Sequence, residues 1–311
     1  MKAVRIHQYG NVDTLRYEDA DEPMVRSDDV LIRVVGTSVN PIDWKVRQGH
    51  LKEIIPHRMP IVLGWDVSGV VAEIGAKVSK FKVGDCVYAR PDAERDGTYA
   101  EFITVRETEI AMKPQTISHI EAGVLPLAGI AAWEAIVNVA KVSAGQRVLI
   151  HAASGGVGSI AAQLAKSRGA FVIGTSSAAN RALVESLGVD EFIDYRAQHL
   201  PDVTSNIDVV FDTVGGQTQN ESWSVMSRGG ILVSIVSNPP EDEAKKLGLR
   251  GAFVSIKPNA PALEEIAQLV DTGKIRPIVG AEFGLKEIKQ AHGLSESGRA
   301  KGKIAIYVGQ P

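Results

Sequence analysis

One stretch of the sequence, residues 148–158 (VLIHAASGGVG), limits the possible folds more than any other. It begins as a buried apolar strand, passes through a glycine-rich turn, and continues from Val157 to Arg168 with apolar residues at helical spacing. A turn in this context is typical of a dinucleotide-binding fingerprint. Gly155 would let the backbone approach a pyrophosphate, and Gly158 would let the helix pack closely on the strand.

The residues that we expect to bind the pyrophosphate are Ser154, Gly155, Gly156, Val157 and Gly158. The helix begins among them, so its free N–H groups and the positive end of its dipole would face the phosphates. Ala153 stands where the common pattern has its first glycine, and a small residue would suffice there. The alternative is a glycine-rich turn that binds nothing.

Strands and helices alternate from Gln146 onward, which predicts a parallel sheet with helices on both faces. We expect strands at 147–151, 171–175, 207–212 and 230–235, and helices at 157–168, 178–187, 217–226 and 260–272.

The N-terminal part of the chain has a different pattern. Residues 1–113 hold short β-like runs separated by Gly, Pro and Asp turns, which predicts an antiparallel, barrel-like region. Ser118 and Glu121 have capping-box spacing, and helical spacing follows to about Ala140. After Ile278 the elements are short again, and a strand over 302–308 could rejoin the first region. A chain of 311 residues favours two such units.

The end of the second predicted strand indicates which nicotinamide cofactor would bind. An NAD-binding site has a carboxylate there for the adenosine ribose, but residues 173–181 (IGTSSAANR) contain no Asp or Glu. The side chains that could hold a 2′-phosphate instead are Ser176, Ser177, Asn180 and Arg181. NADPH is therefore favoured over NADH. Ser177 could also be a helix N-cap and Arg181 a solvated surface charge.

Two later strand ends would lie at the same edge of the sheet. They make Val214, Gly215, Ile235 and Val236 expected contacts of the nicotinamide and ribose. Asp212 could contact the cofactor directly or stabilise a turn. Tyr195 could cover the adenosine half of the cofactor or be an ordinary exposed aromatic residue.

Charge and cysteine content exclude several classes of protein. A net charge of -3 removes the broad attraction for nucleic acids or anionic membranes, so we expect neither partner. No apolar stretch suits a signal peptide or a membrane span, which favours a cytoplasmic protein. Cys86 is the only cysteine, so an intrachain disulfide and a thiolate-rich zinc cluster are excluded. We expect Cys86 to pack in a buried strand.

Several motifs, in order along nearly the whole chain, resemble the medium-chain dehydrogenase/reductase superfamily. They are residues 40–49 (NPIDWKVRQG), 64–71 (GWDVSGVV), 84–88 (GDCVY), 97–102 (GTYAEF), 125–129 (LPLAG), the glycine turn and 302–304 (GKI). The most similar branch is that of the zinc-independent quinone oxidoreductases and alkenal or enone reductases. The resemblance implies an α/β protein with a GroES-like β-barrel catalytic domain (1–122 and 280–311) and a Rossmann NADPH-binding domain with a doubly wound parallel sheet (123–279).

The residues that zinc would need are missing from the matching motifs. In the alcohol dehydrogenase branch the catalytic zinc takes a cysteine and a histidine, but this chain has Asn40 near the first position and Trp65 at the second. We therefore expect no metal. An acceptor reduced without a Lewis acid must itself be electrophilic, such as a quinone or an α,β-unsaturated carbonyl compound.

The resemblance places Asn40 and Lys45 at the nicotinamide cleft, where both could donate hydrogen bonds to the oxygen that becomes negative during hydride transfer. From the residues alone, Asn40 would be a turn residue before Pro41 and Lys45 an exposed helix charge. No acid for protonation at carbon is evident, and water would serve.

Two other functions remain open at this point. A 2-enoyl thioester reductase would share the scaffold and cofactor, and a noncatalytic NADPH-binding sensor or interaction protein could use the same fold. Relatives with this domain plan often pair through an edge strand, here 251–256, so we expect a homodimer.

Overall fold

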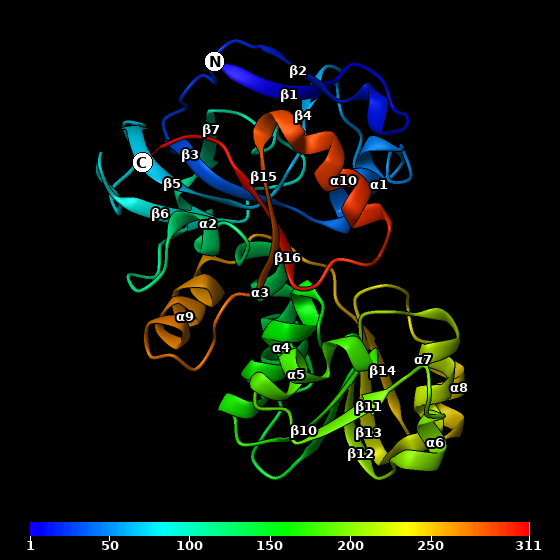
Figure 1. Cartoon of the computed structure of the whole chain (residues 1–311). Coiled ribbons are helices and arrows are strands. Elements are labelled where there is room, and N and C mark those ends of the chain that lie inside the picture. The colour runs from blue at the N-terminus through cyan, green and yellow to red at the C-terminus, as the bar shows by residue number, and fades with distance from the viewer. Residues whose placement is uncertain (311) are drawn as a thin grey trace. The chain divides into compact units, whose positions relative to one another are not determined.

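The alternating segments after residue 146 form one parallel sheet of six strands (Figure 1). The computed structural model describes residues 1–310, and the strands of this sheet lie in the order β11-β10-β9-β12-β13-β14. They are β9 (Arg147–Ile150), β10 (Phe171–Ser176), β11 (Glu191–Asp194), β12 (Ile207–Asp212), β13 (Met226–Ser234) and β14 (Arg250–Phe253). This is the Rossmann order, and it places the topological switch point between β9 and β12.

Helices cover both flanks of this sheet. Figure 1 shows α4 (Gly156–Ser167) and α5 (Arg181–Ser186) on one flank, and α6 (Leu200–Val203), α7 (Gly216–Ser222) and α8 (Glu241–Lys246) on the other. The predicted strands and helices are confirmed, with small differences at their ends. The segment 178–187 begins with a 3-10 turn, Ala178–Asn180, and α7 continues in another, Trp223–Val225. Three short elements, β11, α6 and α8, were not predicted.

The barrel-like region consists of two antiparallel assemblies, to which one parallel pair is added. The larger has the order β15-β16-β3-β5-β6-β8, with β7 also paired to β3, and the smaller has the order β2-β1-β4. The strands are β1 (Lys2–Ile6), β2 (Arg16–Asp19), β3 (Asp29–Val39), β4 (Ile61–Val62), β5 (Val67–Ile74), β6 (Cys86–Ala89), β7 (Phe102–Arg106), β8 (Ile110–Met112), β15 (Val279–Gly284) and β16 (Lys303–Tyr307). Strand β16 pairs antiparallel with β3, so the end of the chain does rejoin the first region.

Four helices belong to this region: α1 (Pro41–Arg47), α2 (His119–Ala122), α9 (Ala260–Asp271) and α10 (Ile288–Glu296). The long helix expected from Ser118 to about Ala140 is wrong in one respect. The chain forms α2, then starts a new helix at Pro126, α3 (Pro126–Trp133), which continues as a π-helix over Glu134–Val139. Proline lacks the N–H that an uninterrupted helix would use, so it begins a helix here rather than continuing one.

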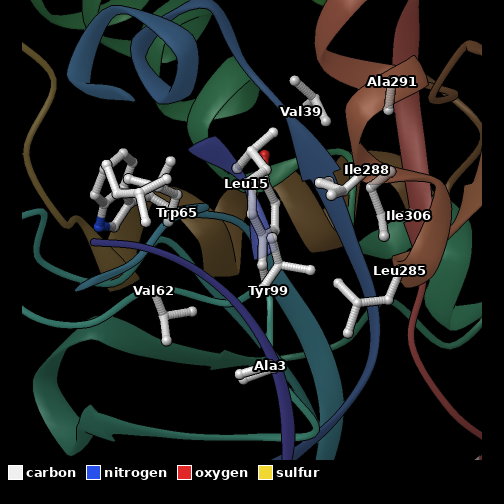
Figure 2. Packing of buried hydrophobic residues seen from close by; sticks show 14 of the residues in the cluster. Ala3, Leu15, Val39, Val62, Trp65, Tyr99, Leu285, Ile288, Ala291 and Ile306 are labelled. Atoms are coloured by element: carbon white, nitrogen blue, oxygen red, sulfur yellow. The ribbon is translucent and has the colours of Figure 1, made fainter. Parts of the chain in front are cut away.

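A buried apolar cluster lies between the small sheet and α10. Figure 2 shows Trp65 and Tyr99 among aliphatic side chains from both ends of the chain, including Leu15, Leu285 and Ile306. Trp65 and Tyr99 are both fully buried. The expectation for Cys86 is wrong, because this first residue of β6 is exposed and only the residues after it are buried.

The contacts within the chain group it into two compact units. One holds residues 1–127, 257–273 and 277–311, and the other holds residues 128–256 and 274–276. Helix α9 thus groups with the first unit, whereas the sequence placed it in the span 123–279. The domain boundaries at 122/123 and 279/280 stay a prediction. None of the helices within residues 1–310 combines the length and the apolar character that a membrane span requires.

Close backbone packing between β3 and β5 depends on a glycine. A Cβ atom at Gly69 would lie 2.1 Å from the carbonyl oxygen of Arg33, a rigid backbone group. We expect Gly69→Ala to lower the free energy of unfolding by roughly 2 kcal/mol or more. Gly293, inside α10, has nothing within 4 Å of its Cβ position, and Gly293→Ala should raise that free energy by about 0.5–1 kcal/mol. Urea unfolding of both variants checks this, and equal effects would contradict it.

Candidate functional site

The predicted phosphate-binding residues form the first turn of α4. Gly155 is the N-cap in extended conformation, and the first helical hydrogen bond runs from the N–H of Ser159 to the carbonyl of Gly155 at 3.0 Å. The amides of Gly156, Val157 and Gly158 therefore precede the helical hydrogen-bond ladder and are free for a ligand. Three N–H groups at the positive end of a twelve-residue helix fit a pyrophosphate.

Gly158 holds the helix against the turn before it. A Cβ atom there would lie 2.3 Å from the carbonyl oxygen of Ala152, so only glycine fits. Ala152 itself has a left-handed φ of 49°, while the next residue, Ala153, donates its N–H to the carbonyl of Thr175 at 2.9 Å. The strained position is thus Ala152, and Ala153 continues the contact with β10. This explains why alanine is tolerated at the first glycine position of the fingerprint.

A cluster of small polar side chains lies where β10 ends. The hydroxyls of Ser154 and Ser176 are 2.7 Å apart, and the Nδ2 of Asn180 donates to Ser154 at 3.0 Å and to Ser176 at 3.2 Å. The Oδ1 of Asn180 is buried without a partner. Ser177 stands at the N-cap of the 3-10 turn, but its side chain does not cap that turn. No carboxylate enters this cluster, which is the arrangement expected for a 2′-phosphate.

Arg181 lies beside this cluster with about half of its side chain exposed. Its guanidinium is 3.2 Å from the Glu185 carboxylate and 4.4 Å from the centre of the Phe192 ring. The sequence left open a surface role, and the exposed pair with Glu185 agrees with that option. An exposed pair of this kind contributes little to stability, so Arg181 is free to turn toward a phosphate at small cost.

Asp212 is a turn residue. Its Oδ1 accepts from the N–H groups of Val214 at 2.9 Å and Gly215 at 2.8 Å, and its Oδ2 accepts from Ser234 and Gln219, each at 2.9 Å. Both oxygens accept hydrogen bonds and Asp212 is fully buried, so this carboxylate stabilises the turn and does not face a ligand.

The other expected cofactor contacts differ in exposure. Val214 and Val236 are exposed and Ile235 is half-buried, at the carboxyl ends of β12 and β13. Tyr195 is exposed, and the Arg196 guanidinium lies 5.6 Å from its ring centre. Apolar side chains held at strand ends and open to solvent are available to a flat ligand.

Asn40 is at the centre of a buried polar network in the other unit. Its Nδ2 donates to Asp66 Oδ2 at 2.8 Å and to Ser38 at 3.3 Å, and its Oδ1 accepts from the Lys303 ammonium. Asp66 Oδ2 also accepts from Ser38 at 2.5 Å and lies 3.4 Å from Lys303 Nζ. The network orients the amide of Asn40, and a substrate oxygen would compete most easily with the long bond to Ser38.

Lys303 was missed as a site residue. The sequence placed it only in a terminal strand motif, and Asn40 is 263 positions away along the chain, so no local pattern joins the two. The pairing of β16 with β3, which brings Ile304 opposite Val39, carries the Lys303 ammonium into the network. Lys45 is not part of it. Its ammonium lies 5.7 Å from the Trp44 ring centre, and it forms no hydrogen bond or ion pair with residues 1–310.

Asp43 is a second buried carboxyl group near Asn40. Its Oδ2 accepts from the backbone N–H of Asn40 and from the Tyr99 hydroxyl, each at 2.7 Å, while its Oδ1 is buried without a partner. Burial raises the pKa of Asp43 to about 7, and the nearby charge of Asp66 acts in the same direction. Asp43 can therefore hold a proton near neutral pH.

Comparison with known proteins agrees with this geometry. Residues 26–115 match the family described as alcohol dehydrogenase GroES-like domain, and residues 187–306 match the family described as zinc-binding dehydrogenase. A relative from Arabidopsis thaliana, the chloroplastic NADPH-dependent alkenal/one oxidoreductase, is 35% identical over 99% of this chain and 79% of its own length. The chain belongs to the medium-chain dehydrogenase/reductase superfamily, in the quinone oxidoreductase and alkenal/one reductase branch.

Two solved structures of this branch superpose on nearly the whole chain. The quinone oxidoreductase from Coxiella burnetii has a TM-score of 0.89 and 33% identity, covering 99% of both chains. The quinone oxidoreductase from Escherichia coli, solved with NADPH, has a TM-score of 0.89 and 25% identity, covering 99% of this chain and all of the other. The expected fold, a GroES-like barrel and a Rossmann domain, is therefore confirmed.

The description of one matching family includes zinc, so the residues must be tested against that metal. Zinc prefers thiolate and imidazole ligands, whereas Asn40 and Trp65 offer an amide and an indole. Within residues 1–310 no group of three His, Cys, Asp or Glu side chains could hold a metal ion. The residues present therefore do not fit a zinc ion, and no step of the reaction is assigned to one.

The raised pKa of Asp43 predicts how stability depends on pH. Between pH 4 and 7 the folded protein keeps a proton that the unfolded chain has lost, so Asp43 lowers stability as the pH rises. A shift from 3.8 to about 7 corresponds to about 4 kcal/mol at most. Asp43→Asn keeps an acceptor for Tyr99 and should remove this dependence. Urea unfolding at pH 5 and 8 measures the free energy of unfolding of both proteins. An equal loss of stability in the wild type and in Asp43→Asn between these pH values would contradict the assignment.

Proposed function

We propose that the protein is an NADPH-dependent reductase that transfers hydride to a quinone or an α,β-unsaturated carbonyl compound without a metal ion. The observation that carries the proposal is the pair of features at the carboxyl end of the Rossmann sheet. Three free amides stand at the start of α4, and hydroxyl and amide groups stand at the end of β10 where NAD-binding sites have a carboxylate.

In this proposal the cofactor site consists of the turn before α4 and the polar cluster at the end of β10. The amides of residues 156–158 would hold the pyrophosphate, and Ser176, Ser177, Asn180 and Arg181 would hold the 2′-phosphate. The unpartnered Oδ1 of Asn180 is an acceptor, and it supports binding of a ligand hydroxyl group at this cluster. NADPH, once bound, supplies the hydride. Tyr195, Val214, Ile235 and Val236 would contact its rings.

The acceptor is proposed from the chemistry of the second unit. Hydride addition to an enone or quinone places negative charge on oxygen, and donors near that oxygen accelerate the reaction. Asn40 and Lys45 are proposed as these donors, with Lys303 and Asp66 positioning the amide of Asn40. The names of the alkenal/one and quinone relatives support this class of acceptor.

Two other proposals complete the account. The edge strand β14 ends at Phe253, shorter than the expected 251–256, and leaves one side of the six-stranded sheet unpaired. We propose that two copies pair there as a homodimer.

We also propose a cytoplasmic location, although several relatives are chloroplastic or mitochondrial proteins.

A panel assay tests the proposal against both alternatives. Purified protein is mixed with NADPH and 9,10-phenanthrenequinone, 1,4-benzoquinone, short 2-alkenals or an enoyl thioester, and loss of nicotinamide absorbance is followed. Turnover of free quinones or enones supports the proposal. Activity on thioesters far above that on free enones would favour the 2-enoyl thioester reductase, and NADPH binding without turnover would favour the noncatalytic protein. Stoichiometric zinc in an active sample would refute the metal-free reaction.

Arg181 gives a prediction about cofactor choice. Arg181→Ala removes a charge-assisted contact to the 2′-phosphate, so the Kd for NADPH should rise by roughly tenfold while that for NADH barely changes. Fluorescence titration measures both constants. A parallel change in the two constants would argue against a phosphate contact.

Asn40 gives a prediction about catalysis. Asn40→Ala should lower kcat by roughly a hundredfold, the usual cost of losing one oxyanion donor, with a Kd for NADPH near that of the wild type. Steady-state kinetics and the same titration separate the two effects. Equal losses of turnover and NADPH affinity would show that Asn40 serves folding rather than catalysis.

A further inference from the structure

One buried cation in the barrel unit, Arg90, has no counterion among residues 1–310. Arg90 follows β6 and has 4% of its surface exposed. Its one hydrogen bond within residues 1–310 runs from Nη1 to the carbonyl oxygen of the adjacent Pro91 at 3.1 Å, and its Nε is buried without a partner. Burial lowers the pKa of Arg90, as expected for a charge taken out of water.

Among residues 1–310, none of the acidic groups whose charges act on Arg90 forms an ion pair with it. Asp92 and Glu109 both bind Arg106, at 3.0 and 2.8 Å. Asp66 accepts from Ser38, Asn40, Lys303 and the N–H of Leu127, which leaves no close contact for a guanidinium. Asp43 uses one oxygen for Tyr99 and Asn40, and its other oxygen is buried without a partner. The negative potential of these groups acts on Arg90, but the guanidinium forms no ion pair with any of them.

The strand register places Arg90 beside the Asn40 network. The β5–β6 ladder ends at the pair Val67 and Ala89, so Asp66 and Arg90 are the first residues beyond it on the two strands. The Arg90 guanidinium is a donor, and an unpaired buried donor beside this network fits an oxygen ligand.

We propose that Arg90 binds a carboxylate on the acceptor, so that the protein prefers α,β-unsaturated carbonyl compounds that carry an acid group. The inference rests on the proposed function and narrows its substrate class. A planar guanidinium can make two parallel N–H···O bonds to a carboxylate, which a neutral acceptor cannot match. The unpaired charge is then compensated when the substrate is bound.

A suitable substrate pair is (E)-4-oxo-2-pentenoate and its methyl ester. Hydride from NADPH adds to one carbon of the C=C bond and a proton from water adds to the other, which gives 4-oxopentanoate and NADP⁺. The ester undergoes the same reaction without the negative charge. The ester is intrinsically the more electrophilic of the two, so recognition of the carboxylate is read from the change in the acid-to-ester ratio that Arg90→Met causes.

Steady-state kinetics on this pair test the proposal. We expect wild-type kcat/KM to favour the acid over the ester by roughly tenfold or more. Arg90→Met should remove this preference by raising KM for the acid, while kcat/KM for the ester should change by less than about threefold. Arg90→Lys should keep part of the preference. Arg299→Met, which removes an exposed arginine, is the matched control and should behave as wild type. No preference in the wild type, or equal losses on both substrates in Arg90→Met, would overturn the proposal.

Binding separates this inference from the proposed function. If neither compound is reduced and the panel of quinones and enones also shows no turnover, the proposed function fails, and calorimetry with the acid in the presence of NADP⁺ still tests Arg90. Binding of the acid to wild type but not to Arg90→Met would support the carboxylate site. Absence of binding to wild type, or equal binding to both proteins, would refute it. Circular dichroism melting of Arg90→Met checks that the variant folds.

Discussion

The nucleotide unit depends on one close approach, that of α4 to the turn after β9. Gly158 faces the carbonyl oxygen of Ala152 at a distance that no side chain allows, so the helix begins directly beside the strand end. Three amides are therefore free at the edge of the sheet where ligands bind in doubly wound folds. The turn at Val214 and Gly215, held from within by Asp212, completes the same edge.

A buried hydrogen-bonded network surrounds Asn40 in the barrel unit. The resemblance sets Asn40 and Trp65 against the thiolate and imidazole ligands of zinc-dependent members, and neither an amide nor an indole fits zinc. Asp66 and Lys303 fix the amide of Asn40, and burial raises the pKa of Asp43 nearby to about 7. Such a network can stabilise charge on an oxygen but cannot activate an unconjugated alcohol as a metal alkoxide would. The electrophile must then be supplied by the substrate, which is why quinones and enones are proposed.

Local patterns predicted the repeating part of the fold well. Strand β12 was expected at 207–212 and is found there, because a buried run bounded by polar residues leaves little choice. Ser176, Ser177 and Asn180 of the β10 cluster were also predicted as site residues, since they are close in sequence, whereas the contact that Ser154 makes with them depends on the pairing of β9 with β10. Lys303 and Arg90 were not recognised as site residues, because their roles depend on pairing between distant strands. Cys86 was misjudged, because the periodicity of β6 does not show where burial begins along a strand.

The central claim is that the turn before α4 holds a reduced dinucleotide with a 2′-phosphate. Isothermal titration calorimetry of the purified protein with NADPH and with NADH tests it most directly. The account predicts saturable binding of one NADPH per chain, with an affinity clearly above that for NADH. If neither dinucleotide binds, the account is contradicted, and a higher affinity for NADH would contradict the role of the β10 cluster.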